Sequence, residues 1–427
     1  MQDTVCCGCS VVCDDVAVSV KKASLQSLGL CRLGHEYCSS IFSKARLTYP
    51  LMKTGDGKPK STTMKKALEK ATELLHESKR PLLIGWSNST TEAITCGLDI
   101  AQHKRGVFDS TASFEYGALL EFGLHGGESE KTSLDTVRDF ADHIVYWGVN
   151  PAESHHRHAS RYTVFPKGKN IPEGRESRVV SVIDIRDTES MRLANHQLIL
   201  SPSTGDEEFL NLLIAELDGT REHLPDKIGG VPAIEFLSFS KQLREASDVA
   251  LFYGNGLLHS PNTRRILPLL AKVNGLLNRN QHRCWTLPMI AYCNTIGAVK
   301  ASLKVAKIPF AIDFHSKSGK SLPSIFSEIR DTKFDCVVIV GWDALSLLPG
   351  PISKALTNLP IIALSTHPTL TTQKASVVFP TALTGAEAAG TVHRMDGTTI
   401  SLQPFKVPPK GVLTEEALLT QLLENLT

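Results

Sequence analysis

The amino-acid sequence predicts an α/β protein built on parallel β-sheets. Continuous apolar runs recur along the 427 residues, and most of them end in a glycine-containing or polar turn. Stretches with apolar residues at helical spacing follow several of these runs. Strands that are apolar on both faces and alternate with helices are typical of parallel sheets covered by helices on both sides. A chain of this length exceeds what one hydrophobic core organises, so we expect two or three domains.

The predicted elements follow in order along the chain. A short strand is expected at residues 16–20, a connecting segment at 33–62, and a helix at 64–78. Buried strands are predicted at residues 80–87, 143–151, 178–184, 248–256, 335–343, 359–365 and 375–380. Further helices are predicted at residues 90–104, 263–274 and 413–426. Ligands of parallel sheets lie beyond the carboxyl ends of the strands, so the turns after these strands are the expected ligand positions.

Composition and charge narrow the classes of partner. Hydrophobic residues make up 42% of the chain and charged residues 21%, with a formal net charge of +2. This near balance gives no electrostatic reason to expect a nucleic-acid or membrane partner. No apolar run approaches the roughly 20 residues that span a bilayer, and no secretory signal pattern is present. The cysteines outside the N-terminal region are scattered singly, which favours a reducing, cytoplasmic setting.

The strongest local signal is a group of cysteines at the N-terminus. The spacing Cys6-x2-Cys9-x3-Cys13-x17-Cys31 places three thiolates on a short loop and a fourth further along the chain. Three local sulfur ligands and one remote ligand are typical of a [4Fe–4S] cluster. A zinc site and a set of buried thiols or disulfides are the alternatives. A zinc ribbon usually has two C-x2-C pairs, and Cys31 has no partner two residues away.

Several polar segments follow the predicted strands. A histidine-rich run begins at His155 and fits either a metal site or, as we favour, a basic rim for an anionic ligand or a partner chain, because no carboxylate lies at ligand spacing beside it. Asp184 and Arg186 end another strand, where they could bind a polar ring or phosphate. Instead of this role or beside it, Asp187 or Thr188 could form the N-cap of a helix. Gly254 and Gly256 form only a fragment of a dinucleotide-binding glycine pattern.

In combination, these segments resemble the catalytic B subunit of formylmethanofuran dehydrogenase, in the molybdopterin oxidoreductase superfamily. The resemblance covers nearly the whole chain and rests on many motifs in the right order. They are Cys6-x2-Cys9-x3-Cys13-Asp14-Asp15, Cys31-Arg32-x-Gly34-His35, Arg80-Pro81-Leu82-x2-Gly85-Trp86-Ser87, Thr111-Ala112-Ser113, Tyr146-Trp147-Gly148-x-Asn150-Pro151, His155-x-Arg157-His158-x-Ser160-Arg161, Thr286-Leu287-Pro288-Met289 and Glu387-Ala388-x-Gly390-Thr391-x2-Arg394-Met395.

The resemblance implies a domain order and two cofactors. It implies an N-terminal iron–sulfur domain at residues 1–50, a first α/β domain at 51–114 and 300–427, and a second at 115–299, without the superfamily's C-terminal barrel. In this family the four cysteines hold a [4Fe–4S] cluster, and a bis-pterin molybdenum or tungsten centre lies between the α/β domains. By resemblance, the residues lining the pterin cavity are Gly148, Asn150, His155, Asp184, Arg186, Gly254, Gly256, Gly341 and Arg394.

One departure from the family falls at the metal-ligand position. After the Thr-Ala-Ser motif, the family has an apolar residue, then a cysteine or selenocysteine that binds the metal, then a histidine that handles protons. This chain has Phe114, Glu115 and Tyr116 at those positions. A hard carboxylate therefore replaces a soft ligand, and a phenol with a pKa of about 10 replaces a group that titrates near neutrality.

The same kind of replacement is typical of bacterial relatives that this chain resembles, in which the B subunit has lost its redox centre. Those relatives belong to a formyltransferase/hydrolase complex that moves formyl groups between a methanopterin carrier, a furan-type carrier and formate, with hydrolysis on a dizinc subunit. We therefore expect a B subunit with a degenerate metal–pterin site in tetrahydromethanopterin-linked one-carbon metabolism. Its expected partners are the hydrolase (A), C and formyltransferase subunits and a furan-type carrier. The alternatives are an active molybdenum or tungsten formylmethanofuran dehydrogenase with Glu115 as metal ligand, and an iron–sulfur binding or structural protein.

Overall fold

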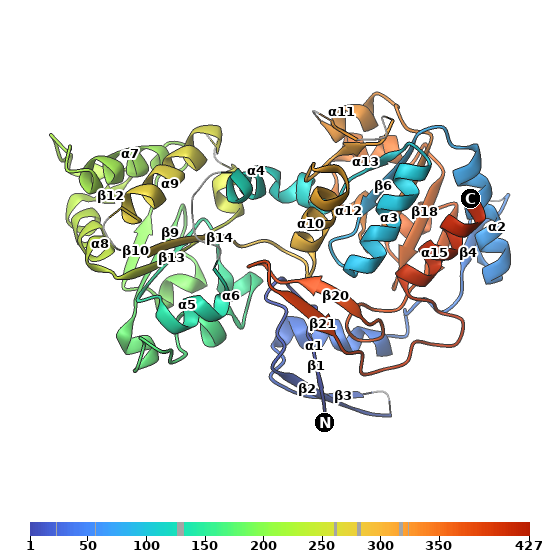
Figure 1. Ribbon diagram of the computed structural model, residues 1–427, viewed down its shortest axis with the longest axis horizontal. Helices are drawn as coiled ribbons and strands as arrows, with labels where there is room; N and C mark the ends of the chain where they lie inside the picture. Colours follow the sequence, from blue (N-terminus) through green and yellow to red (C-terminus); the bar gives the residue numbers. More distant parts are fainter. Residues whose placement is uncertain are drawn as a thin grey trace. The chain divides into compact units, whose positions relative to one another are not determined.

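The computed structural model describes residues 1–22, 24–55, 57–125, 132–259, 263–279, 283–315, 319–322 and 324–427. The chain divides into two compact units, the first comprising Met1–Phe114 and Tyr292–Thr427 and the second comprising Glu115–Ala291. Each unit contains one large sheet with a core of parallel strands (Figure 1). The predicted α/β class with parallel sheets is confirmed, and the sheets of the described residues are open rather than closed into a barrel.

The first unit is built on a nine-stranded sheet in the order β16-β15-β7-β6-β17-β18-β19-β4-β5. Its parallel centre consists of β6 (Pro81–Gly85), β17 (Cys336–Val340), β18 (Ile361–Ser365) and β19 (Val377–Pro380). These four strands agree with the prediction from their apolar runs. The outer strands are β7 (Val107–Phe108), β15 (Ile312–Asp313), β16 (Lys320–Ser321), β4 (Leu51–Lys53) and β5 (Pro59–Ser61).

Helices cover both faces of this sheet because alternate side chains of each central strand pack in opposite directions. Leu83 and Val338 belong to the core that includes α2, α3, α10 and α15, whereas Leu82 and Val337 belong to the core with α11, α12 and α13. The helices are α2 (Met64–Glu77), α3 (Thr91–His103), α10 (Thr295–Ala306), α11 (Ile325–Arg330), α12 (Ala344–Leu347), α13 (Gly350–Leu356), α14 (Leu370–Lys374) and α15 (Glu415–Leu426).

The second unit contains a five-stranded, fully parallel sheet in the order β10-β9-β8-β13-β14. Its strands are β8 (His143–Trp147), β9 (Val179–Asp184), β10 (His196–Ile199), β13 (Asp248–Tyr253) and β14 (Arg283–Pro288). In Figure 1, α7 (Gly205–Leu217), α8 (Ala233–Glu245) and α9 (Thr263–Leu277) lie on one face of the sheet, with α5 (Leu134–Phe140) and α6 (Pro151–Ser154) on the other. The sequence predicted β8, β9 and β13 but not β10 and β14.

The N-terminal part of the first unit is a small antiparallel sheet followed by a helix. The strands β1 (Gln2–Thr4), β2 (Val16–Lys21) and β3 (Ser24–Leu28) pair in sequence order, and the first three tetrad cysteines lie between β1 and β2. The prediction that residues 33–62 form only a connecting segment is wrong. Those residues include most of α1 (Arg32–Ser39) and the β4–β5 hairpin, because α1 is capped by the Cys31 side chain and buries Cys38.

A second hairpin follows near the C-terminal end of the chain. Strands β20 (Gly390–His393) and β21 (Thr399–Leu402) pair antiparallel, although the sequence suggested an irregular run there. No helix in the part of the chain that the structure describes combines the length and the apolar character needed to cross a membrane.

Candidate functional site

The four tetrad cysteines gather in the first unit, around the loop between β1 and β2. Cys6 and Cys13 are buried, and Cys9 and Cys31 are partly buried. Burial raises the pKa of the Cys9 thiol, and the neighbouring Cys13, Cys6 and Cys31 raise it further. A Cβ built at Gly34 would lie 2.7 Å from the Cys6 Sγ and 3.8 Å from the Cys31 Sγ, so Cys31 lies beside the loop although it is remote in the sequence.

Backbone N–H groups point at two of these sulfur atoms. The Gly8 N–H donates to the Cys6 Sγ at 3.5 Å, and the Gly34 N–H donates to the Cys31 Sγ at 3.4 Å. A Cβ at position 34 would lie 2.7 Å from the Cys6 Sγ, so a glycine is needed there. Donors of this kind stabilise thiolates and tune iron–sulfur clusters, so the set of donors and sulfur atoms fits a [4Fe–4S] cluster.

The described side chains are not arranged as a site for a single metal ion. Within the described ranges, no three histidine, cysteine, aspartate or glutamate side chains are grouped so that they could hold a metal ion. A single zinc ion requires ligands about 2 Å from one point.

Two further thiols join the cysteine loop through contacts that the sequence did not reveal. The Cys6 thiol forms a hydrogen bond with Cys38, and the Cys7 thiol forms one with Cys293. Cys293 packs in one apolar cluster with Cys7 and Val12. No spacing rule could have connected Cys293 with the N-terminus, because the contact exists only in the folded chain.

A cavity of about 360 Å³ lies at the carboxyl ends of β8, β9 and β13 in the second unit. Six of the residues assigned by resemblance to a pterin cavity line it: Gly148, Asn150, His155, Asp184, Arg186 and Gly256. A Cβ at Gly256 would lie 2.6 Å from the Gly148 Cα, so glycine lets the two turns approach. Gly254 does not line the cavity. A Cβ there would lie 2.8 Å from the Val149 Cβ, so this glycine serves close packing.

The polar side chains of this second-unit cavity are held in place by protein contacts. Burial lowers the pKa of His155 to about 4, and its Nε2 lies 3.0 Å from the Ile290 carbonyl oxygen, so the ring is a neutral donor there. The Asn150 Nδ2 donates to Glu189 Oε2 at 2.9 Å. Burial raises the pKa of Asp184, which accepts a hydrogen bond from the Ile185 N–H at 2.8 Å. Such fixed polar groups suit an uncharged or anionic organic ligand.

The two residues at the family's metal-ligand and histidine positions lie on α4 (Thr111–His125). Tyr116 lines the second-unit cavity. Burial and, after it, the charge of Glu115 raise the pKa of Tyr116 to about 12, and the Tyr116 hydroxyl forms hydrogen bonds with Glu115 and Asn255. The phenol is therefore neutral near pH 7, and it occupies part of the hydrogen-bonding capacity of the Glu115 carboxylate.

The first unit has its own cavity, of about 270 Å³, at the carboxyl ends of β6, β17, β18 and β19. Gly341, assigned by resemblance to the pterin cavity, lines it. Trp342, Asp343 and Ser365 also line it, and they belong to the strand-end segments where ligands were expected. Residues outside the predicted strands complete the lining, namely Cys7, Gly8, Tyr37, Asn88, Thr366, His367, Thr369, Thr381, Ala382, Leu383, Thr384 and Glu415. The buried Trp342 Nε1 and Thr381 Oγ1 atoms have no hydrogen-bond partner among the described residues. Buried polar groups normally have partners, so these two atoms are suited to contact a ligand.

Glu415 of this first-unit cavity gives a pH-dependent prediction. Its carboxyl group is at the start of α15 and is 8% exposed, and burial raises its pKa from 4.5 to about 7. Because the pKa of Glu415 is higher in the folded chain than in the unfolded chain, the folded state binds the proton more tightly, and this stabilises it. The stabilisation is complete below about pH 4.5 and is lost as the pH rises through about 7.

We therefore expect the unfolding free energy of the wild type to fall by about 2–3 kcal/mol between pH 5 and pH 8 because of Glu415. In Glu415→Gln this fall is expected to be absent. Denaturant unfolding at both pH values measures the effect. Glu416→Gln changes an exposed carboxylate in the same helical turn and serves as the control. An unchanged pH dependence in Glu415→Gln would contradict the assignment of the buried acid.

Arg394, the last residue assigned to the pterin cavity by resemblance, lines neither of the two cavities. Its side chain is 2% exposed and forms an ion pair with Asp396, whose side chain is fully buried. The structure therefore gathers six assigned residues in one unit and Gly341 in the other, and it places Arg394 in a hairpin turn.

The whole length of this chain is similar to known proteins, although no family model matches it. Two curated relatives are each described as the B subunit of a tungsten-containing formylmethanofuran dehydrogenase 2. The protein from Methanocaldococcus jannaschii is 28% identical over 432 residues, and the one from Methanococcus maripaludis is 28% identical over 433 residues. Each alignment covers 100% of this chain and 98% of the relative. The resemblance to the B subunit of formylmethanofuran dehydrogenase is confirmed.

Solved structures share the fold of this chain. The formyltransferase/hydrolase complex from Methylorubrum extorquens, solved with methylofuran, contains a chain that matches 88% of this chain and 98% of its own length, with a TM-score of 0.65 and 18% identity. Acetylene hydratase from Pelobacter acetylenicus matches 100% of this chain and 69% of its own, with a TM-score of 0.70 and 13% identity. At these identities, the matches establish the fold.

Proposed function

We propose that this chain is the B subunit of a formylmethanofuran dehydrogenase-like formyltransferase/hydrolase complex, with a degenerate metal–pterin site. Its role is to scaffold the hydrolase and formyltransferase subunits and to help hold a furan-type one-carbon carrier. The full-length similarity to two B subunits supports the subunit assignment. The fold shared with a chain of a formyltransferase/hydrolase complex supports a place in such an assembly.

The proposal of a degenerate metal–pterin site depends mainly on the Glu115–Tyr116 pair. Position 115 offers no sulfur or selenium to a soft metal centre, and its carboxylate already accepts a hydrogen bond from Tyr116. A phenol whose pKa is about 12 does not exchange a proton near neutrality, as the family's histidine does. Both functions expected of these two positions are therefore lost together, and we assign no reaction step to a metal.

The cysteine tetrad, the two cavities and the metal-ligand position differ in which cofactor groups their residues fit. The thiols of Cys6, Cys9, Cys13 and Cys31 fit a [4Fe–4S] cluster, which supplies one-electron transfer when it is bound. The cavity residues of both units fit the polar ring and phosphate portions of an organic ligand. The metal-ligand position does not fit the molybdenum or tungsten of the family, which prefers sulfur or selenium there.

Metal analysis of the complex purified from its native source tests this proposal. We expect iron in the chain, molybdenum, tungsten and pterin far below one per chain, and formyl hydrolase activity in the partner subunits. Glu115→Ala is expected to leave hydrolase activity within about twofold of the wild type, because position 115 takes no part in hydrolysis. Glu121→Ala, an exposed glutamate in the same helix, is the matched control. Stoichiometric molybdenum or tungsten would contradict the degenerate site.

The second candidate function is an active molybdenum- or tungsten-dependent formylmethanofuran dehydrogenase with Glu115 as a metal ligand. The two cavities at strand ends favour it, since residues assigned by resemblance to the pterin cavity line both, six in the second unit and Gly341 in the first. Under this function, Glu115→Ala abolishes formyl oxidation and lowers metal content, whereas Glu121→Ala changes neither. Retained metal and turnover in Glu115→Ala would exclude a ligand role for this carboxylate.

A further inference from the structure

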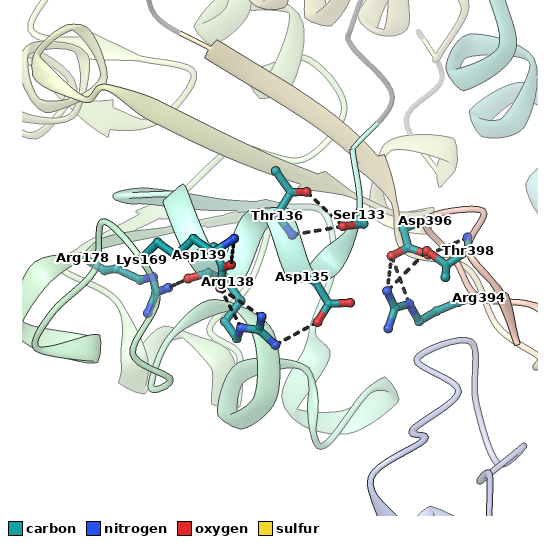
Figure 2. A network of polar contacts seen from close by, with 10 residues as sticks. All are labelled: Ser133, Asp135, Thr136, Arg138, Asp139, Lys169, Arg178, Arg394, Asp396 and Thr398. Atoms are coloured by element: carbon teal, nitrogen blue, oxygen red, sulfur yellow. Dashed lines mark hydrogen bonds and ion pairs between the residues drawn. The ribbon is translucent and has the colours of Figure 1, made fainter.

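The turn of the β20–β21 hairpin contains an ion pair that is almost fully buried. The Arg394 Nη2 lies 2.7 Å from the Asp396 Oδ2, and the Arg394 Nε lies 3.0 Å from the same oxygen. The side chains are 2% and 0% exposed. The other carboxylate oxygen, Asp396 Oδ1, accepts a hydrogen bond from the Thr398 N–H at 2.9 Å. Figure 2 shows these three side chains directed toward one another within the turn.

The backbone of the same turn is closed by further hydrogen bonds. The Arg394 N–H donates to the Thr398 carbonyl at 2.9 Å, and the Gly397 N–H donates to the Arg394 carbonyl at 2.7 Å. Gly397 has a φ of +84°, a conformation that favours glycine. The Lys300 Nζ reaches the Gly397 carbonyl at 2.6 Å from α10. The ion pair and the backbone together specify one geometry for residues 394–398.

This hairpin lies against the cysteine loop. The Met395 N–H donates to the carbonyl oxygen of Ser10 at 3.0 Å, and Ser10 lies between Cys9 and Cys13 in the sequence. Val392 and Leu402, one from each strand, pack in a single apolar cluster with the loop residues Val5, Cys7 and Val12. Beyond β21, the Gln403 carbonyl accepts a hydrogen bond from the Thr4 hydroxyl at 2.8 Å. The hairpin therefore contacts the loop before Cys6 and again between Cys9 and Cys13.

We infer that Arg394 is a positioning residue for the cysteine loop, in contrast to the cavity role that the sequence resemblance implies. Its ion pair with Asp396 fixes the turn, the turn places the Met395 N–H, and that donor holds Ser10 between two tetrad cysteines. The inference rests on the proposed iron–sulfur cluster. Groups that orient metal ligands through hydrogen bonds commonly change metal retention by about 10–100-fold when they are removed.

Cluster retention in the whole chain, within its complex, tests the inference. Iron per chain and the rate of iron loss to a chelator are measured well below the unfolding temperature. We expect Arg394→Met to lose iron roughly tenfold faster than the wild type. Arg394→Lys keeps the charge but not the two-point contact, so it is expected to fall between them and serves if Arg394→Met fails to fold. Arg283→Met is the matched control, because it breaks the Asp248–Arg283 ion pair of the second unit.

The outcomes separate this inference from the proposed function. Iron-free wild-type protein would remove the cluster itself and with it the basis of the inference. Iron in the wild type with an unchanged loss rate in both Arg394 variants would overturn the positioning role alone. Equal acceleration in Arg394→Met and Arg283→Met would also overturn it, because general destabilisation would then explain the loss. Faster loss in the Arg394 variants only is the supporting result.

Discussion

Replacing Glu387 with alanine is expected to lower the free energy of unfolding by about 3–5 kcal/mol. Glu387 forms an ion pair with the Arg46 Nη2 at 2.5 Å, and the side chains are 1% and 4% exposed. Arg46 also donates to the carbonyl oxygens of Thr366 and Thr381, which follow β18 and β19. Removing the carboxylate leaves a buried guanidinium without its counter-charge, and this unpaired charge is the main cost. Denaturant unfolding of the single variant measures the change.

Two comparisons distinguish the buried charge from a general loss of contacts. The double variant Arg46→Met with Glu387→Leu removes both charges and fills the space, so it is expected to regain most of the lost stability. Glu73→Ala breaks the Lys70–Glu73 pair, whose side chains are 37% and 51% exposed, and is expected to cost less than about 1 kcal/mol. A double variant no more stable than Glu387→Ala would contradict the account.

The sequence predicted the central strands because burial on both faces leaves a continuous apolar run. Strands β6 and β17 are entirely buried, and each was recognised. Strand β10 lies at the sheet edge and buries only Leu198, so its residues carried no comparable pattern. The two residues of β7 are too few to show any periodicity. Edge position and short length, which depend on the assembled sheet, explain these omissions.

The candidate site was predictable where it depends on strand ends. Gly148 follows β8, Asp184 ends β9 and Gly341 follows β17, and all three line a cavity. Ligands of many kinds bind at the carboxyl ends of parallel strands. Glu415 was missed because it begins a helix after a connecting segment, and only packing brings it to the cavity. The motif alone assigned Arg394 to a cavity although Asp396 is only two residues away, because the burial of this ion pair and the contact of its turn with the cysteine loop are tertiary features.

The second large effect concerns the tetrad. We expect Cys13→Ser to reduce iron per chain to a small fraction of the wild-type value, because a serine hydroxyl replaces a soft thiolate ligand. Cys13 is buried in the loop, and its backbone carbonyl accepts a hydrogen bond from the Cys6 N–H at 2.9 Å, a contact that the substitution leaves intact. Elemental analysis and the visible absorption of the anaerobically purified protein measure the loss.

Two cysteines outside the tetrad make this experiment specific. Cys38 is 1% exposed and forms a hydrogen bond with Cys6, yet the proposed ligand set does not include it, so Cys38→Ser is expected to retain iron. Cys96→Ser changes a thiol on α3 that lies 3.6 Å from the Thr420 hydroxyl and controls for the chemical change itself. Iron retained in Cys13→Ser but lost from Cys38→Ser would move the ligand role to Cys38. Zinc in place of iron in the wild type would instead establish the alternative metal, because thiolates bind both metals but a zinc site is colourless and has no redox chemistry.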